Sequence, residues 1–217
     1  MNALLLTRLR GVYPLSPDWD DDARLLAASA AVLGAGVRLL QYRHKTASAA
    51  VRRRQAAALR ALTREHGALL IVNDDAQLAA DIGADGVHLG RDDGSVAAAR
   101  ALLPAGSLIG VSCYDDWARA ERAAADGADY VAFGSVFASR VKPDAVRAPL
   151  ALFARARAAG LPAVAIGGID ERNIAQVAAA GAQAAALISA VYDAPDPAAA
   201  ARRLSEEFQR GQAPHEP

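Results

Sequence analysis

Short, almost continuously apolar segments alternate with longer segments rich in alanine, leucine and arginine along most of the chain. The apolar segments have the length and composition of strands that are buried on both faces, as in a parallel sheet. The longer segments have high helix propensity. The predicted strands are residues 11–13, 37–42, 69–73, 86–89, 108–112, 130–133, 163–166 and 185–188. The predicted helices are residues 22–33, 48–65, 76–82, 95–102, 117–126, 150–159, 172–180 and 197–209.

Eight strand–helix pairs in succession match an α/β fold, a single-domain (β/α)8 TIM barrel. A weak internal repeat supports it, because glycines at 34, 83, 127 and 181 each end a predicted helix just before every second strand. The alternative is an open doubly wound sheet, but eight regular units leave no natural sheet edge. We predict an N-terminal extension at 1–10, the barrel at 11–210 and a flexible tail at 211–217.

Composition and charge narrow the classes of function. The 217 residues are 53% hydrophobic and 22% charged, which favours a sizeable core over disorder. Lys and Arg number 24 and are balanced by 24 Asp and Glu, so no overall basic field favours nucleic acid. No segment approaches the roughly 20 apolar residues of a membrane span, and Cys113 alone forms no internal disulfide. We expect a cytoplasmic protein without nucleic-acid or membrane partners; a homo-oligomer stays open.

Polar residues and glycines collect where the predicted strands end, and in a barrel these ends form one mouth that carries the functional groups. Asp74 and Asp93 follow adjacent parallel strands, so their carboxylates are expected to converge. Two hard oxygen ligands suit Mg²⁺, which takes further ligands from water and phosphates. The alternative is that they cap the following helices, as Asp75 and Asp92 could also do. The spacing leaves both interpretations open.

Two anion sites are indicated at the same mouth. Gly167 and Gly168 after the seventh strand let backbone N–H groups approach a phosphate, although a tight turn without ligand needs the same residues. Arg43 and Lys45 lie beside the acidic pair, with Lys142 across the mouth, as in a metal-bound diphosphate held by cations. A solvated charged rim is the alternative. Together these features suit two anionic substrates that are joined with loss of diphosphate.

Other chemistry-bearing residues are expected to be structural. His88 lies inside the predicted fourth strand on a packed face, so we do not expect it to be a catalyst. Cys113 has no evident activating base near it in the sequence, so a nucleophilic role is not expected. Gln41 and Asn73 offer amide hydrogen bonds that could serve either a ligand or the fold.

In this order the motifs resemble the thiamine phosphate synthase family, over about residues 11–208. The resemblance is carried by Gln-Tyr-Arg-His-Lys at 41–45, Asn-Asp-Asp at 73–75, Gly-Ala-Asp-Gly-Val-His-Leu-Gly at 83–90 with Asp93, Gly-Val-Ser at 110–112 and Ala-Ile-Gly-Gly-Ile at 165–169. It implies a barrel enzyme that joins 4-amino-2-methyl-5-hydroxymethylpyrimidine diphosphate to a thiazole phosphate. The implied products are thiamine phosphate and diphosphate, and Mg²⁺ is the implied cofactor.

The resemblance also implies roles for individual residues. The pyrimidine diphosphate is bound by Gln41, Tyr42, Arg43, His44, Lys45, Asn73, Ser112 and Lys142. The thiazole phosphate is bound by Ser139, Arg140, Val141, Gly168, Ile188 and Ser189. Mg²⁺ is held by Asp74 and Asp93, and the catalytic residues are Lys142, Ser112 and Arg43. The family usually has a threonine where Val141 stands, so one hydroxyl contact to the thiazole phosphate is missing, although a backbone N–H can still serve.

Three other functions remain as alternatives. A related thiazole tautomerase would need neither a diphosphate clamp nor a metal, and a noncatalytic precursor-binding barrel would bind without turnover. A phosphosugar isomerase would need a Glu or His base after a strand, and none stands out. The joint presence of Arg43, Lys45, Asp74 and Asp93 favours the synthase.

Overall fold

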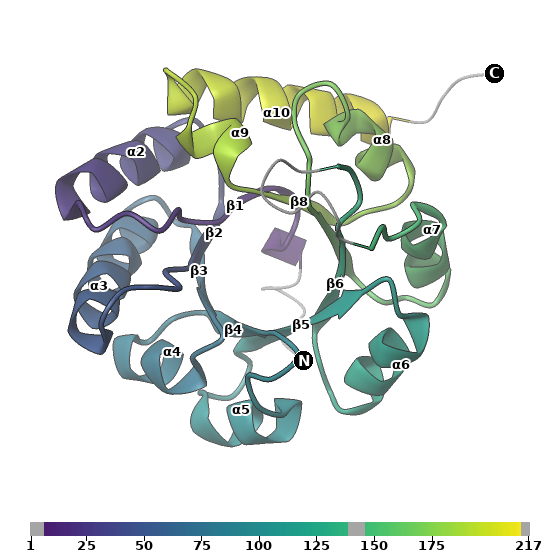
Figure 1. The fold of residues 1–217 in the computed structure, drawn as a ribbon, viewed down its shortest axis with the longest axis horizontal. Helices are drawn as coiled ribbons and strands as arrows, with labels where there is room; N and C mark the ends of the chain where they lie inside the picture. The colour runs from purple at the N-terminus through teal and green to yellow at the C-terminus, as the bar shows by residue number, and fades with distance from the viewer. Residues whose placement is uncertain (1–6, 139–145, 214–217) are drawn as a thin grey trace.

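Eight parallel strands form a barrel with helices around its outside, seen down the barrel in Figure 1. The computed structural model describes residues 7–138 and 146–213. The strands are β1 (Gly11–Pro14), β2 (Leu39–Tyr42), β3 (Leu69–Asn73), β4 (Gly86–Leu89), β5 (Leu108–Tyr114), β6 (Tyr130–Gly134), β7 (Ala163–Ile166) and β8 (Ala184–Leu187). The described helices are α2 (Asp22–Gly34), α3 (Ala49–Glu65), α4 (Ala76–Ile82), α5 (Val96–Leu102), α6 (Trp117–Ala125), α7 (Ala151–Ala158), α8 (Ile174–Ala179), α9 (Ser189–Tyr192) and α10 (Pro197–Gln212).

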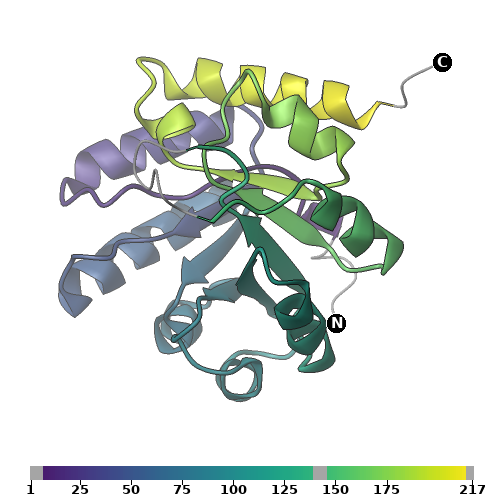
Figure 2. The same cartoon turned by 45° about the vertical axis from the view of Figure 1, so that its right-hand side comes forward.

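The strands follow one another around the barrel in chain order, and β1 pairs with β8. The remaining seam, between β1 and β2, is joined by a parallel bridge from Leu15 to Gln41. Beside it, the Ser16 N–H donates to the Gln41 carbonyl at 2.8 Å. Outside the strands, α10 packs against both α8 and α2, which connects the last unit to the first (Figures 1 and 2). The (β/α)8 prediction is therefore confirmed, and the open doubly wound sheet is excluded.

Alternate strand residues point into the barrel or out towards the helices, which gives two apolar clusters. The inner cluster consists of Leu9, Tyr13, Leu15, Leu39, Leu69, Ile71, Leu108, Tyr130, Ala132, Val164, Ala184 and Ala186. The larger outer cluster joins the opposite faces of the strands to the helices. The barrel interior is thus a packed core, and ligands must bind at its ends. No helix within the described residues is long and apolar enough to cross a membrane.

Element bounds differ from the predicted ones in a few places. The strand β5 runs on to Tyr114, with a shift of register between Ser112 and Tyr114. The helix α9, four residues long, was not predicted, because one turn carries no helical periodicity. The helix α10 ends at Gln212, three residues past the predicted end at 209 and two past the predicted barrel boundary at 210. Gly211 in this last turn packs closely on Ala175, where a side chain would not fit.

Residues 7–10, just before β1, contribute to the inner core, although their sequence predicts no role for them. Leu9 is fully buried in the inner cluster, at the amino end of the strands. The Arg8 guanidinium donates to the Gly67 carbonyl beyond α3. This segment lies across the barrel centre in Figure 1, at the purple end of the chain. It therefore closes the end of the barrel opposite the predicted mouth.

We expect Leu9→Ala to lower the free energy of unfolding by about 2–5 kcal/mol, because it leaves a cavity in the inner core. Urea unfolding followed by far-UV circular dichroism measures this change. The matched control is Leu102→Ala, since Leu102 is 49% exposed and a surface substitution changes stability by only about 0.5 kcal/mol. Equal, small effects of the two substitutions would show that Leu9 does not contribute to the core.

Candidate functional site

The acidic pair Asp74 and Asp93 lies at the carboxyl ends of β3 and β4. The Asp74 backbone has a positive φ of 65°, and its N–H donates to the His88 carbonyl at 2.7 Å. The Asp93 carboxylate accepts the Gly90 N–H at 3.0 Å. Burial raises the pKa of Asp93, and so do the hydrogen bond and the negative charge of Asp74 beside it. The two carboxyl groups therefore converge, as their positions after adjacent strands predict.

Other residues cap the helices that follow the acidic pair. The Asp75 carboxylate accepts the Leu78 N–H at 2.9 Å at the start of α4. The Ser95 hydroxyl accepts the Ala98 N–H at 3.1 Å at the start of α5. The capping interpretation thus holds for Asp75, whereas the carboxylates of the acidic pair do not cap α4 or α5. Both carboxylates line an adjoining cavity of about 220 Å³, together with Lys45.

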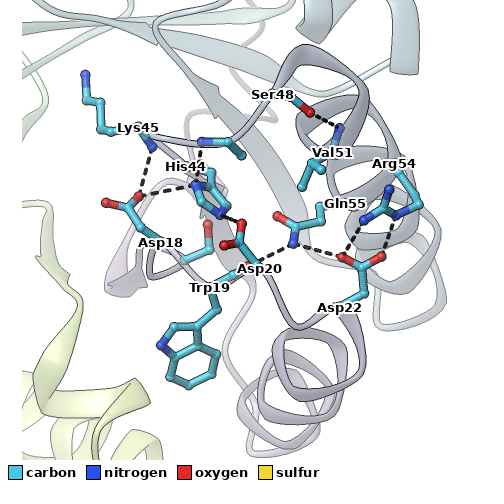
Figure 3. A network of polar contacts seen from close by, with 12 residues as sticks. Asp18, Trp19, Asp20, Asp22, His44, Lys45, Ser48, Val51, Arg54 and Gln55 are labelled. Atoms are coloured by element: carbon cyan, nitrogen blue, oxygen red, sulfur yellow. Dashed lines mark hydrogen bonds and ion pairs between the residues drawn. The ribbon is translucent and has the colours of Figure 1, made fainter.

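The two cations next to the acidic pair already have carboxylate partners. The Lys45 ammonium group pairs with Asp74. The Arg43 guanidinium donates to both carboxylate oxygens of Asp18, at 3.0 and 3.1 Å. Asp18 also accepts the Lys45 backbone N–H at 2.9 Å, as Figure 3 shows. Asp18, from the β1–α2 loop, therefore fastens the β2–α3 loop that carries both cations. The sequence does not predict this role of Asp18, because nothing in the sequence of one loop indicates a contact with another loop.

His44 and Tyr42 point away from the barrel interior. The His44 side chain is 1% exposed and lies between the two loops (Figure 3), 3.3 Å from an Asp20 carboxylate oxygen. The Tyr42 hydroxyl donates to Gln55 of α3 at 3.1 Å. Successive side chains of a strand point to opposite faces, so Gln41, next to Tyr42, points into the barrel. Substrate binding by Tyr42 and His44 stays a prediction, and both have structural partners here.

Below the mouth, polar side chains form a chain of contacts inside the barrel. The Gln41 amide nitrogen donates to the Tyr13 hydroxyl at 2.8 Å, and that hydroxyl lies 3.3 Å from the Tyr130 hydroxyl. His88 Nδ1 lies 3.1 Å from the Tyr130 oxygen, and Nε2 lies 2.9 Å from Ser112 Oγ. Burial lowers the pKa of His88 to about 4, so its ring is neutral. His88 is buried, as expected, but it contacts a predicted site residue.

The predicted thiazole phosphate residues are only partly described. Gly167 and Gly168 have positive φ angles of 102° and 66°. A Cβ on Gly168 would lie 2.4 Å from the Ala138 carbonyl oxygen. This close packing requires glycine with or without a ligand, so the phosphate role stays a prediction. Ser189 begins α9 directly after Ile188. Ser139, Arg140, Val141 and Lys142 lie outside the described residues.

Cys113 is buried on the outer face of β5. Burial raises the pKa of its thiol to about 12, so it stays protonated at neutral pH. This agrees with the expectation that it is not a nucleophile.

The chain is similar to known proteins in both sequence and fold. A family model described as thiamine monophosphate synthase matches residues 12–191. The chain belongs to this family.

A thiamine-phosphate synthase of Chromobacterium violaceum is 58% identical over 201 residues, covering 93% of this chain and 97% of that protein. That of Halorhodospira halophila is 55% identical over 205 residues, covering 94% and 97%. A thiamine phosphate pyrophosphorylase structure from Pyrococcus furiosus superposes with a TM-score of 0.84 at 31% identity, covering 96% of this chain and 100% of that one. The resemblance identified from the sequence motifs is confirmed.

We expect Asp18→Ala to weaken binding of inorganic diphosphate, in the presence of Mg²⁺, about three- to tenfold, which corresponds to one or two lost hydrogen bonds. The β2–α3 loop loses the hydrogen bond from the Lys45 N–H to Asp18, so the loop that carries both cations is no longer held in place. Isothermal titration calorimetry measures the Kd. Asp18→Asn should restore most of the affinity, because an amide oxygen can still accept the Lys45 N–H.

Asp22→Ala is the matched control for Asp18→Ala. Both aspartate side chains are 34% exposed and pair with an arginine, but the partner of Asp22 is Arg54 on the outer face of α3. If the two alanine variants bind diphosphate equally well, Asp18 has no positioning role.

Proposed function

We propose that the chain joins 4-amino-2-methyl-5-hydroxymethylpyrimidine diphosphate to a thiazole phosphate, or its carboxylate, with diphosphate as the second product. That the chain is a transferase of thiamine biosynthesis follows from its family and its relatives. The observation that carries the finer proposal is the acidic pair beside Lys45 at the barrel mouth. A diphosphate needs cations, and an acidic pair can hold a divalent one.

The acidic pair fits Mg²⁺ by its chemistry. Its donors are hard carboxylate oxygens, and the pKa of Asp93 is raised partly because Asp74 places a second negative charge beside it. Within the described part of the chain, no group of three or more His, Cys, Asp or Glu residues is arranged so that it could hold a metal ion. Two carboxylates suit Mg²⁺, which takes its remaining ligands from water and substrate phosphates. When bound, the ion would supply positive charge that stabilises the departing diphosphate.

The cations of the β2–α3 loop act on the same leaving group. Lys45 and Arg43 would exchange their carboxylate partners for diphosphate oxygens and offset the charge that grows there. The carbon–oxygen bond breaks, and the diphosphate leaves with the electron pair. The electron-rich aminopyrimidine supports the positive charge at its methylene carbon until the thiazole nitrogen attacks. No protein nucleophile is needed, which agrees with the protonated, buried thiol of Cys113.

The remaining residues position the two substrates. On the pyrimidine side we assign Gln41, Asn73 and Ser112, and on the thiazole side Gly168, Ile188 and Ser189. Lys142 would reach the leaving group from the β6–α7 loop, while the backbone at Val141 would contact the thiazole phosphate. The chain's part in the reaction is then to hold both rings in line and to exclude water. We place this reaction in the cytoplasm.

The test is an assay for diphosphate release with both substrates and with Mg²⁺ either added or chelated. We expect release to require both substrates and the metal. Asp74→Ala and Asp93→Ala should each lower turnover about a hundredfold or more, because charge stabilisation of the leaving group is lost. Their thermal unfolding should stay close to that of the original protein, since both side chains lie at the mouth outside the core clusters.

Asp92→Ala is the matched control, since Asp92 is exposed and neighbours Asp93. It should keep full activity. Undiminished metal-dependent turnover in Asp74→Ala would rule out the metal assignment. Isomerisation of the thiazole carboxylate without diphosphate release would indicate the tautomerase instead. Binding of both substrates with neither reaction would indicate a precursor-binding barrel.

A further inference from the structure

Five polar side chains cross the barrel interior in one continuous series of contacts. In order they are Gln41 of β2, Tyr13 of β1, Tyr130 of β6, His88 of β4 and Ser112 of β5. The first four are buried, and Ser112 is partly exposed at the mouth. Because each member comes from a different strand, the series exists only in the closed barrel. Ser112, at the partly exposed end, can reach a ligand directly.

The order of donors along this series follows from its first member. The Gln41 amide nitrogen has only protons to give, so the Tyr13 oxygen accepts there. The Tyr13 hydroxyl has one proton, and the Tyr130 oxygen, 3.3 Å away, is the acceptor that its described contacts offer, so we direct the Tyr13 proton there. The Tyr130 proton is in turn directed to His88 Nδ1, at 3.1 Å. Each hydroxyl thus accepts on one side and donates on the other.

This order selects one form of the His88 ring. A neutral imidazole carries one proton, and whichever nitrogen accepts leaves the other as the donor. Since Nδ1 accepts from Tyr130, the proton sits on Nε2 and is donated to Ser112 Oγ at 2.9 Å. The Ser112 oxygen is then occupied as an acceptor, and its own proton is free to point to the mouth.

We infer that Tyr13, Tyr130 and His88 are positioning residues that present the Ser112 hydroxyl to the substrate as a hydrogen-bond donor. This inference rests on the proposed function, because the matching acceptor is a ring nitrogen of the aminopyrimidine. A ring with a carbon or an N–H at that position could not accept a hydrogen bond from the Ser112 hydroxyl. The buried series would thus contribute to selection of the heterocycle, although three of its members never touch it.

The first test needs no substrate. Long-range proton–nitrogen NMR spectra of ¹⁵N-histidine-labelled protein report which ring nitrogen is protonated, and His88→Gln assigns the signal among the four histidines. We expect His88 to carry its proton on Nε2. A proton on Nδ1 would reverse the order of donors and overturn the inference, whether or not the protein turns out to be a synthase.

The second test asks whether Tyr130 acts through Ser112. Tyr130→Phe should raise the KM for the pyrimidine diphosphate about three- to tenfold, the effect of one hydrogen bond, and leave the KM for the thiazole phosphate unchanged. Ser112→Ala should do at least as much. The double variant should be no worse than Ser112→Ala alone, because residues in one network are not additive. Multiplicative effects would mean that Tyr130 has only a structural role.

Tyr192→Phe is the matched control, since Tyr192 is also buried and its hydroxyl contacts Ser29 at 3.1 Å, outside the series. It should lose similar stability with both KM values unchanged. If Tyr192→Phe raises the KM for the pyrimidine diphosphate as Tyr130→Phe does, the effect reflects general loosening, and the inference fails. Intact turnover with unchanged KM in Tyr130→Phe would overturn the inference and leave the proposed function standing.

Discussion

Closure of the parallel strands into a barrel is the constraint on which the other features depend. Because all strands run the same way, their carboxyl ends meet at one mouth, and because the sheet closes, each strand has one face inside and one outside. Asp74 and Asp93 converge for the first reason. Gln41 and Tyr42 separate for the second: one joins the interior series, and the other packs against α3.

At the mouth, the ion pair between Lys45 and Asp74 contributes little to stability. Lys45 pairs with Asp74, but its side chain is 49% exposed, and such pairs contribute only about 0–1 kcal/mol to stability. In the proposed reaction, a diphosphate would therefore displace Asp74 at little cost. The displaced carboxylate would then face Asp93 without a cation, which is an environment that favours a divalent ion. Binding of a diphosphate and of a metal at this mouth would thus support each other, since each neutralises charge that the other leaves unpaired.

Sequence patterns predict the features that depend on local signals or on the order of the strands in the chain. The strand and helix segments follow from apolar runs and helix propensity, and the acidic pair follows from the order of adjacent strands. The same patterns do not predict contacts between segments that lie far apart in the chain. The sequence places Leu9 in the predicted N-terminal extension, because its burial depends on the closed barrel. The sequence predicts Tyr130 only as part of a strand, because its contact with Tyr13 joins positions 117 residues apart. Asp18 was missed for the same reason, since it belongs to one loop and acts on another.

The interior of the barrel changes from apolar to polar along its axis, and this change defines where function can lie. Leu9, Leu69 and Leu108 fill the amino end, where no polar group needs a partner. Nearer the mouth the same interior holds an amide, two phenols and an imidazole, which are costly to bury unless they are paired. They pair with one another, and among the described residues only the Gln41 side-chain oxygen lacks a hydrogen-bond partner in this series. A stable barrel could use apolar residues in this layer at lower cost. Their replacement by a paired polar series directly beneath Ser112 is explained if the layer serves the ligand above it.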